Sequence, residues 1–262
     1  MAGQAVSRPV FLLLLLLVAA LPLGGCASDQ AGSGYSWGWY VLSPFNDKGA
    51  ANLRFLLAGA GLTLGLSVTA LFVSVLLGLA LALAALSGSG LLRRVSRVYV
   101  EIFRAIPLLV LLLWVYYGLP VVSGLQFGAF TAGVLSLALS DAAFEAEIFR
   151  AGIQSVPRGH REAAQALGLA PWQTFRFVIL PQALRVILPA LGNQFVYVLK
   201  MSSLVSVIGL QELTRRANEL NVTEYRPLEI YSALVLEYLL LILLTSWLVR
   251  RLERRMARSG TR

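Results

Sequence analysis

The chain has 262 residues, of which 58% are hydrophobic and 13% are charged, and this balance is far from that of an average soluble domain. A formal net charge of +9 is compatible with nucleic-acid binding in a soluble protein. Here the basic residues cluster at the ends of apolar segments, so the composition favours an integral membrane protein and argues against a nucleic-acid partner.

The N-terminal segment, residues 1–26, allows two interpretations. Arg8 followed by an apolar stretch at about 10–25 is typical of a signal peptide. The run from Leu23 to Cys26 resembles a lipoprotein cleavage site, at which Cys26 would be lipidated. The alternative is an uncleaved first membrane helix with a buried cysteine. Both interpretations place residues 27–51 on the external, periplasmic side of the membrane.

The remaining apolar segments predict an all-α integral membrane protein. Hydropathy indicates membrane spans at about 53–86, 99–119, 128–149, 186–208 and 228–249. We therefore expect a five-helix core domain over residues 52–250, preceded by one N-terminal span or signal segment and followed by a basic tail at 251–262. Within the first core span, the pair Gly61 and Gly65, and Gly78 near Ala82, predict close helix packing.

The distribution of basic residues predicts the orientation. Most arginines, including Arg93, Arg150 and those of the C-terminal tail, lie on one side of the predicted spans. The other side carries only Lys48, Arg54, Arg215, Arg216 and Arg226. Since basic residues accumulate in cytoplasmic loops, the first side is expected to face the cytoplasm.

A polar segment at residues 158–181 interrupts the apolar spans on this cytoplasmic side. Ser155 is suited to cap a helix, and Pro157 is suited to its first turn. We expect a short helix over 158–167 that ends at Gly168 with a positive φ angle. Pro171 would then begin a second helix. In isolation, this pattern also fits an ordinary solvated loop helix.

The spacing of residues within the segment is more specific. It consists of Glu-Ala-Ala, a glycine and a terminal Leu-Pro, formed by Glu162, Ala163, Ala164, Gly168, Val178, Ile179, Leu180 and Pro181. This spacing resembles the EAA loop of the membrane subunits of ATP-binding-cassette (ABC) importers, with Val178 in place of the usual isoleucine. Residues 103–109, 146–150 and 200–209 resemble the polar amino-acid permease branch. The resemblance extends over about 53–253, and we call residues 158–181 the EAA segment.

The resemblance implies a type I ABC importer transmembrane fold and a coupling role for the EAA segment. The residues expected to couple to an ATPase are Glu162, Ala163, Ala164, Gly168, Leu180 and Pro181. ATP and magnesium would be bound by a partner subunit, and this chain would contribute no catalytic residue and no cofactor. The sequence has no phosphate-binding loop, and its single histidine and single cysteine argue against a metal site.

Lys200 is the notable charged residue inside a predicted span, where a lysine is costly unless it meets water, substrate or a carboxylate. Following the resemblance, Lys200 with Ser202 and Ser203 would line the substrate pathway. The alternative is an ion pair with Asp141 or Glu145, which lie on one helix face. If those two carboxyl groups lined the pathway instead, they would favour a cationic amino acid.

The resemblance also implies the partners and the location. It predicts a second permease subunit, identical or paralogous, a dimer of ATP-binding subunits, an external amino-acid-binding protein and surrounding lipid, in the bacterial inner membrane. The rival interpretation is a stand-alone secondary transporter. That class is built from internal repeats and interrupted helices around an ion site, and the sequence shows no clear repeat.

Overall fold

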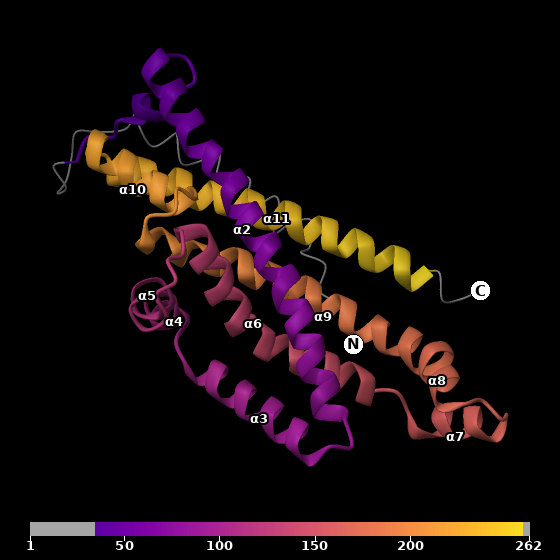
Figure 1. Cartoon of the computed structure of the whole chain (residues 1–262). Helices are drawn as coiled ribbons and strands as arrows, with labels where there is room; N and C mark the ends of the chain where they lie inside the picture. Colours follow the sequence, from indigo (N-terminus) through magenta and orange to yellow (C-terminus); the bar gives the residue numbers. More distant parts are fainter. Residues whose placement is uncertain (1–34, 259–262) are drawn as a thin grey trace. The chain divides into compact units, whose positions relative to one another are not determined.

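The computed structural model describes residues 35–258, with side chains described as far as residue 251 (Figure 1). The predicted first span at 10–25 and Cys26 lie outside the described residues. Residues 41–258 belong to one compact unit, and the short stretch before them belongs to a separate one. The described residues are helical and contain no strand, as the composition predicts.

The helical elements follow one another with short connections. They are η2 (Trp39–Leu42), α2 (Asp47–Leu86), α3 (Gly90–Ala105), α4 (Leu108–Leu113), η3 (Trp114–Gly118), α5 (Leu119–Ser123), α6 (Ala129–Gln154), α7 (Arg158–Ala166), α8 (Pro171–Thr174), η4 (Phe175–Ile179), α9 (Leu180–Met201), η5 (Ser202–Ile208), α10 (Leu213–Glu224) and α11 (Pro227–Arg258). Four helical stretches among the described residues are long and apolar enough to cross a membrane: Asp47–Leu86, Ala129–Gln154, Pro171–Ile208 and Pro227–Arg251.

The direction of the packed helices can be read from glycine contacts. A Cβ atom on Gly133 of α6 would lie 3.2 Å from the Leu66 side chain of α2. Further along both helices, a Cβ on Gly78 would lie 2.7 Å from the Cβ of Glu145. Because later residues of α2 meet later residues of α6, the two helices run parallel. Their apolar side chains share a core cluster with α4, η3, α9 and η5.

The parallel arrangement requires the chain to cross back between α2 and α6. The only helices between them are α3 and the run from α4 to α5. Together these are long and apolar enough to form one span, which is bent by 101°. The single continuous span predicted at 99–119 is therefore wrong. Pro107 lacks a backbone N–H and disfavours helical geometry at the preceding residue, so Ile106 is extended at φ −84° and ψ 124°.

Two other prolines are accommodated without a break. The π-helical turns η3 and η4 each end two residues before a proline, Pro120 and Pro181 respectively. A proline inside a helix removes one hydrogen bond and crowds the preceding turn. A π turn, where it occurs, is mostly a single widened turn inside a continuous helix. Helical structure consequently runs without interruption from Pro171 through Ile208.

Only part of the predicted glycine packing is found. Gly78 is buried and allows α2 to approach α6, as predicted. Gly61 and Gly65 have open space where a Cβ would lie, so they pack against nothing in the described chain. The physical reason is helix rotation, because these two glycines lie on the face opposite the buried row of α2.

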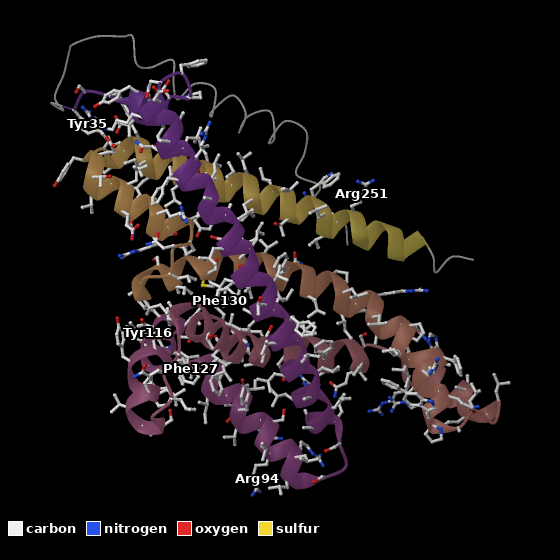
Figure 2. All side chains as sticks on the ribbon, turned by 45° about the horizontal axis from the view of Figure 1, so that its top comes forward. Tyr35, Arg94, Tyr116, Phe127, Phe130 and Arg251 are labelled. Atoms are coloured by element: carbon white, nitrogen blue, oxygen red, sulfur yellow. The ribbon has the colours of Figure 1, made fainter. Side chains whose placement is uncertain are left out.

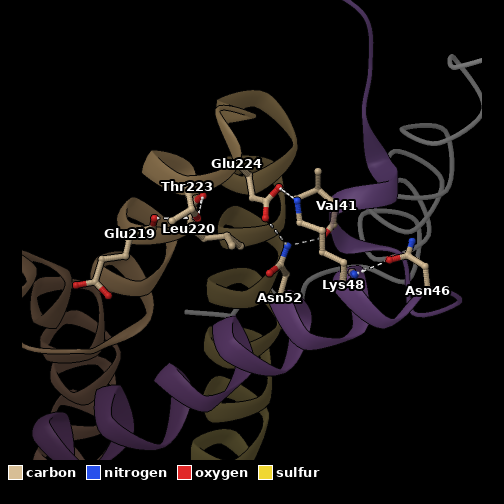
Figure 3. A network of polar contacts seen from close by, with 9 residues as sticks. Val41, Asn46, Lys48, Asn52, Glu219, Leu220, Thr223 and Glu224 are labelled. Atoms are coloured by element: carbon tan, nitrogen blue, oxygen red, sulfur yellow. Dashed lines mark hydrogen bonds and ion pairs between the residues drawn. The ribbon is translucent and has the colours of Figure 1, made fainter.

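The two ends of the bundle carry different polar structure. At the end where α2 begins, Lys48 forms a 2.8 Å ion pair with Glu224, and Asn52 donates to Glu224 and to the Val41 carbonyl (Figure 3). These contacts fasten the end of α10 to the start of α2. The opposite end, where α2 and α6 finish, carries α7 and Arg150. This separation agrees with the orientation that the charge distribution predicts.

Candidate functional site

The first part of the EAA segment forms helix α7 between a proline and a glycine. Gly168 has a φ of +77°, as predicted, and its N–H donates to the Gln165 carbonyl. Pro171 begins the next helix, also as predicted. The expected cap at Ser155 is wrong, because this residue ends α6. Its N–H donates to Ala151 and its hydroxyl to the Gly152 carbonyl, so α7 begins after Pro157 without a side-chain cap.

The Glu-Ala-Ala triplet is divided between two faces of α7. Ala164 is buried, on the helix that packs against α8 and η4, whereas Glu162 and Ala163 are exposed. The small side chain of Ala164 therefore packs α7 against the rest of this chain. The carboxylate of Glu162 and the methyl group of Ala163 remain accessible to another protein.

Large apolar side chains are also exposed within the EAA segment. Leu167 is 81% exposed, and Trp172 and Phe177 are each 64% exposed. All three belong to the polar EAA segment rather than to a predicted membrane span. Exposed apolar side chains of this size are suited to contact with another protein or with the membrane.

The rest of the EAA segment is built into a long helix. Leu180 is half-buried and Pro181 is exposed, and both lie in the continuous helical stretch that leads to η5. His160 of α7 contacts this stretch, with 2.8 Å between its Nδ1 and the Oε1 of Gln182. Gln182 also donates to the Val178 carbonyl. The short helix α7 is thus tied to the helix that enters the bundle.

Asp141 and Glu145 are buried side by side on α6. Asp141 accepts hydrogen bonds from the Ser74 hydroxyl, at 2.9 Å, and from the side-chain amide of Gln194. Asp141 therefore joins α2, α6 and α9. Both carboxyl oxygens of Glu145 are buried and have no hydrogen-bond donor among the described residues. Within those residues, no group of His, Cys, Asp or Glu could hold a metal ion.

Lys200 is not brought to this carboxyl pair. Its side chain is exposed on α9, and the structure records no ion pair for it among the described residues. The predicted alternative of an ion pair with Asp141 or Glu145 is therefore not formed in this subunit. Lys200 instead shares an exposed stripe of α9 with Asn193 and Tyr197, three to four residues apart along the helix.

The two serines after Lys200 do not form one polar patch with it. Ser202 is completely buried and donates to the Leu199 carbonyl. Ser203 is partly exposed and donates to the Lys200 carbonyl. Sequence reasoning also missed Ser74 and Gln194, although a polar residue within an apolar helix is a signal for a buried partner.

Comparisons with known proteins identify the family of this chain. The model of the family described as "Binding-protein-dependent transport system inner membrane component" matches residues 74–258. The glutamine transport system permease protein GlnP of Escherichia coli K12 is 42% identical over 205 residues, which cover 78% of this chain and 94% of that protein. The arginine transport system permease protein ArtQ of Bacillus subtilis 168 is 35% identical over 204 residues, with coverages of 78% and 93%.

A solved structure is similar over the same extent. The structure, described as an amino acid ABC transporter with histidines, has a TM-score of 0.74 and 42% sequence identity, and the match covers 79% of this chain and 96% of that chain. The family match over residues 74–258 includes both the exposed EAA segment and the bent span. This chain belongs to the family of inner membrane components of binding-protein-dependent transport systems.

Proposed function

We propose that this chain is the membrane-spanning subunit of an ATP-driven importer that carries a polar amino acid across the bacterial inner membrane. Family membership and the permeases of glutamine and arginine among its relatives support the transport function and the substrate class. The observation that carries the coupling proposal is the exposed face of α7 on a helix tied directly to a membrane-crossing stretch.

The proposed division of labour assigns ATP and magnesium to a partner subunit. α7 would sit in a cleft on that subunit, with Glu162 supplying a charge-assisted hydrogen bond and Ala163 allowing close approach. The exposed Leu167, Trp172 and Phe177 would contact the rim of this cleft. A second permease subunit and an external binding protein complete the proposed assembly.

Movement of α7 has a direct route into the bundle. The contact of His160 with Gln182 and the uninterrupted helix from Pro171 to Ile208 connect the docking face to the region of Lys200. Closure of the ATPase pair would displace this helix as a rigid body and change which side of the membrane has access to the pathway.

The pathway is proposed to run along the exposed stripe of α9, where Lys200 would bind the carboxylate of the amino acid. Ser203 lies three residues further along the chain, in η5, and is partly exposed. The burial of Asp141 and its bonds to two other helices support a packing role for this group in preference to substrate contact. Glu145 and Ser202, which are completely buried, fit the same role.

The proposal is tested by reconstituting the chain in proteoliposomes with its ATPase and binding protein. ATP hydrolysis should rise when one polar amino acid is supplied with the binding protein, and uptake should require ATP. The chain purified alone should hydrolyse no ATP. Uptake by the chain alone, driven by an ion gradient, would instead establish the rival function of a secondary transporter.

A further inference from the structure

A pocket of about 560 Å³ lies between α3 and the finishing ends of α2 and α6. Its lining residues are Ala85, Arg93, Ser96, Arg97, Val100, Glu101, Arg104, Glu147, Arg150 and Gln154. The pocket is at the same end of the bundle as α7, which the charge distribution assigns to the cytoplasm. It is separate from the exposed face of α7 and from the stripe around Lys200.

The pocket has an excess of positive charge, because it contains four arginines and two glutamates. Arg150 is paired, with 2.6 Å to Glu147 and 2.7 Å to Gln154. The guanidinium of Arg104 lies 5.1 Å from the centre of the Phe144 ring. No ion pair is recorded for Arg93 or Arg97 in the described part of the chain. Arginines arranged in this way are suited to a phosphate group.

The outer face of α3 is apolar. Leu91, Val95, Val98 and Ile102 recur at helical spacing and are between 46% and 71% exposed. With 3.6 residues per turn, this stripe lies on the face of α3 opposite Arg93, Arg97 and Arg104, so the helix turns its arginines toward the pocket and its apolar side chains away from the bundle. Because this apolar face is suited to contact acyl chains, the pocket lies behind a helix that borders the bilayer, within reach of the headgroup of a neighbouring phospholipid.

We propose that this pocket binds the headgroup of an anionic phospholipid from the cytoplasmic leaflet. Basic pockets between helices on this side of a membrane are suited to such headgroups. The lipid would hold α3 against α2 and α6, next to the Ser96 hydroxyl that bonds the Leu81 carbonyl at 2.9 Å. Since α3 is the first half of the bent span, the lipid would steady the part that precedes the break at Pro107. The inference depends on the membrane orientation and not on which substrate is transported.

The experiment is lipid retention by the purified chain, measured by native mass spectrometry in detergent with dioleoylphosphatidylglycerol or dioleoylphosphatidylcholine. The anionic lipid should be retained selectively. Each of the variants Arg93→Gln and Arg97→Gln should weaken its binding about fivefold. Arg94→Gln is the matched control, because Arg94 has the same charge, lies on the same helix and does not line the pocket (Figure 2). It should change binding less than about twofold.

A variant of opposite sign makes the test independent of folding defects. Glu101→Gln removes a negative charge from the pocket lining and should tighten binding of the anionic lipid about fivefold. If an arginine variant fails to fold by circular dichroism, Glu101→Gln alone decides the question. Unchanged binding in Glu101→Gln would overturn the proposal.

Three further outcomes would also overturn it. Equal loss in Arg94→Gln and Arg97→Gln would show diffuse surface attraction rather than a pocket. Displacement of the lipid by an equal concentration of glycerol phosphate would show a site for a soluble anion. Stoichiometric displacement by the purified partner ATPase would show a docking site for an acidic protein segment.

Discussion

The EAA segment and the buried carboxyl groups of α6 hold polar residues under opposite physical conditions. α7 exposes nearly every side chain, so Glu162 and its neighbours are hydrated at little cost. Asp141 and Glu145 are excluded from solvent, where each polar atom needs a partner. A polar sequence motif on an exposed surface therefore indicates contact with another protein. The role of a polar residue inside the bundle depends on which helix it faces.

The largest effect is expected where the buried region is most tightly packed. Gly78→Leu would place a side chain 2.7 Å from the Glu145 Cβ and 3.1 Å from backbone atoms of α6, which cannot move aside. We expect destabilisation of about 3 kcal/mol or more and little folded protein. Gly65→Leu is the matched control on the same helix, since its Cβ meets nothing. Thermal unfolding of the purified chain measures both, and equal effects would contradict the described packing of α2.

In the exposed region, Gly168→Asp should reduce uptake at least about tenfold without reducing the amount of folded protein. The reason is the positive φ of Gly168, together with an added charge at the proposed docking face. Gly168→Asn should retain more uptake because asparagine adopts this conformation more readily. Uptake by proteoliposomes, normalised to protein, is the measurement. Normal uptake by the aspartate variant would remove the coupling role of this turn.

Between the two regions, Lys200→Met should abolish uptake and leave assembly of the complex unchanged. The structure places this lysine on an exposed stripe without a carboxylate partner, so its loss leaves no buried charge unpaired. The double variant Lys200→Met with Asp141→Asn should remain inactive. Gel filtration reports assembly and proteoliposome uptake reports transport, and recovered uptake in the double variant would restore the ion-pair interpretation.

The smallest effects distinguish the two buried carboxyl groups from each other. Asp141→Ala leaves the Ser74 hydroxyl and the Gln194 amide without their acceptor, which should cost about 1–3 kcal/mol. Glu145→Gln removes a carboxyl group that accepts no hydrogen bond in the described structure, and we expect a change below about 1 kcal/mol. Denaturant unfolding of the purified chain compares them. The reverse order would mean that Glu145 has a partner in the assembled transporter.

The sequence determined the features that depend on neighbouring residues. Four of the membrane-crossing helices, the short helix α7 and the left-handed turn at Gly168 all follow from local composition and spacing, and the structure confirms them in the described residues. The EAA spacing also indicated the family before any contact was known. Ser155 is the local exception, because either adjoining helix can use a serine at a helix boundary and the tertiary arrangement assigned it to α6.

The rotation and bending of the apolar helices were decided only by the tertiary structure. α2 is apolar on all sides, so its sequence has no contrast that separates the buried Gly78 from the open Gly61 and Gly65. The outward direction of Lys200 and the bond between Asp141 and Gln194 likewise depend on how α9 is turned against α6. A hydropathy profile averages over many residues, so a single proline such as Pro107 does not change it. The profile therefore does not indicate the 101° bend. In a membrane segment that is uniformly apolar, only contacts between distant helices fix which face is inside.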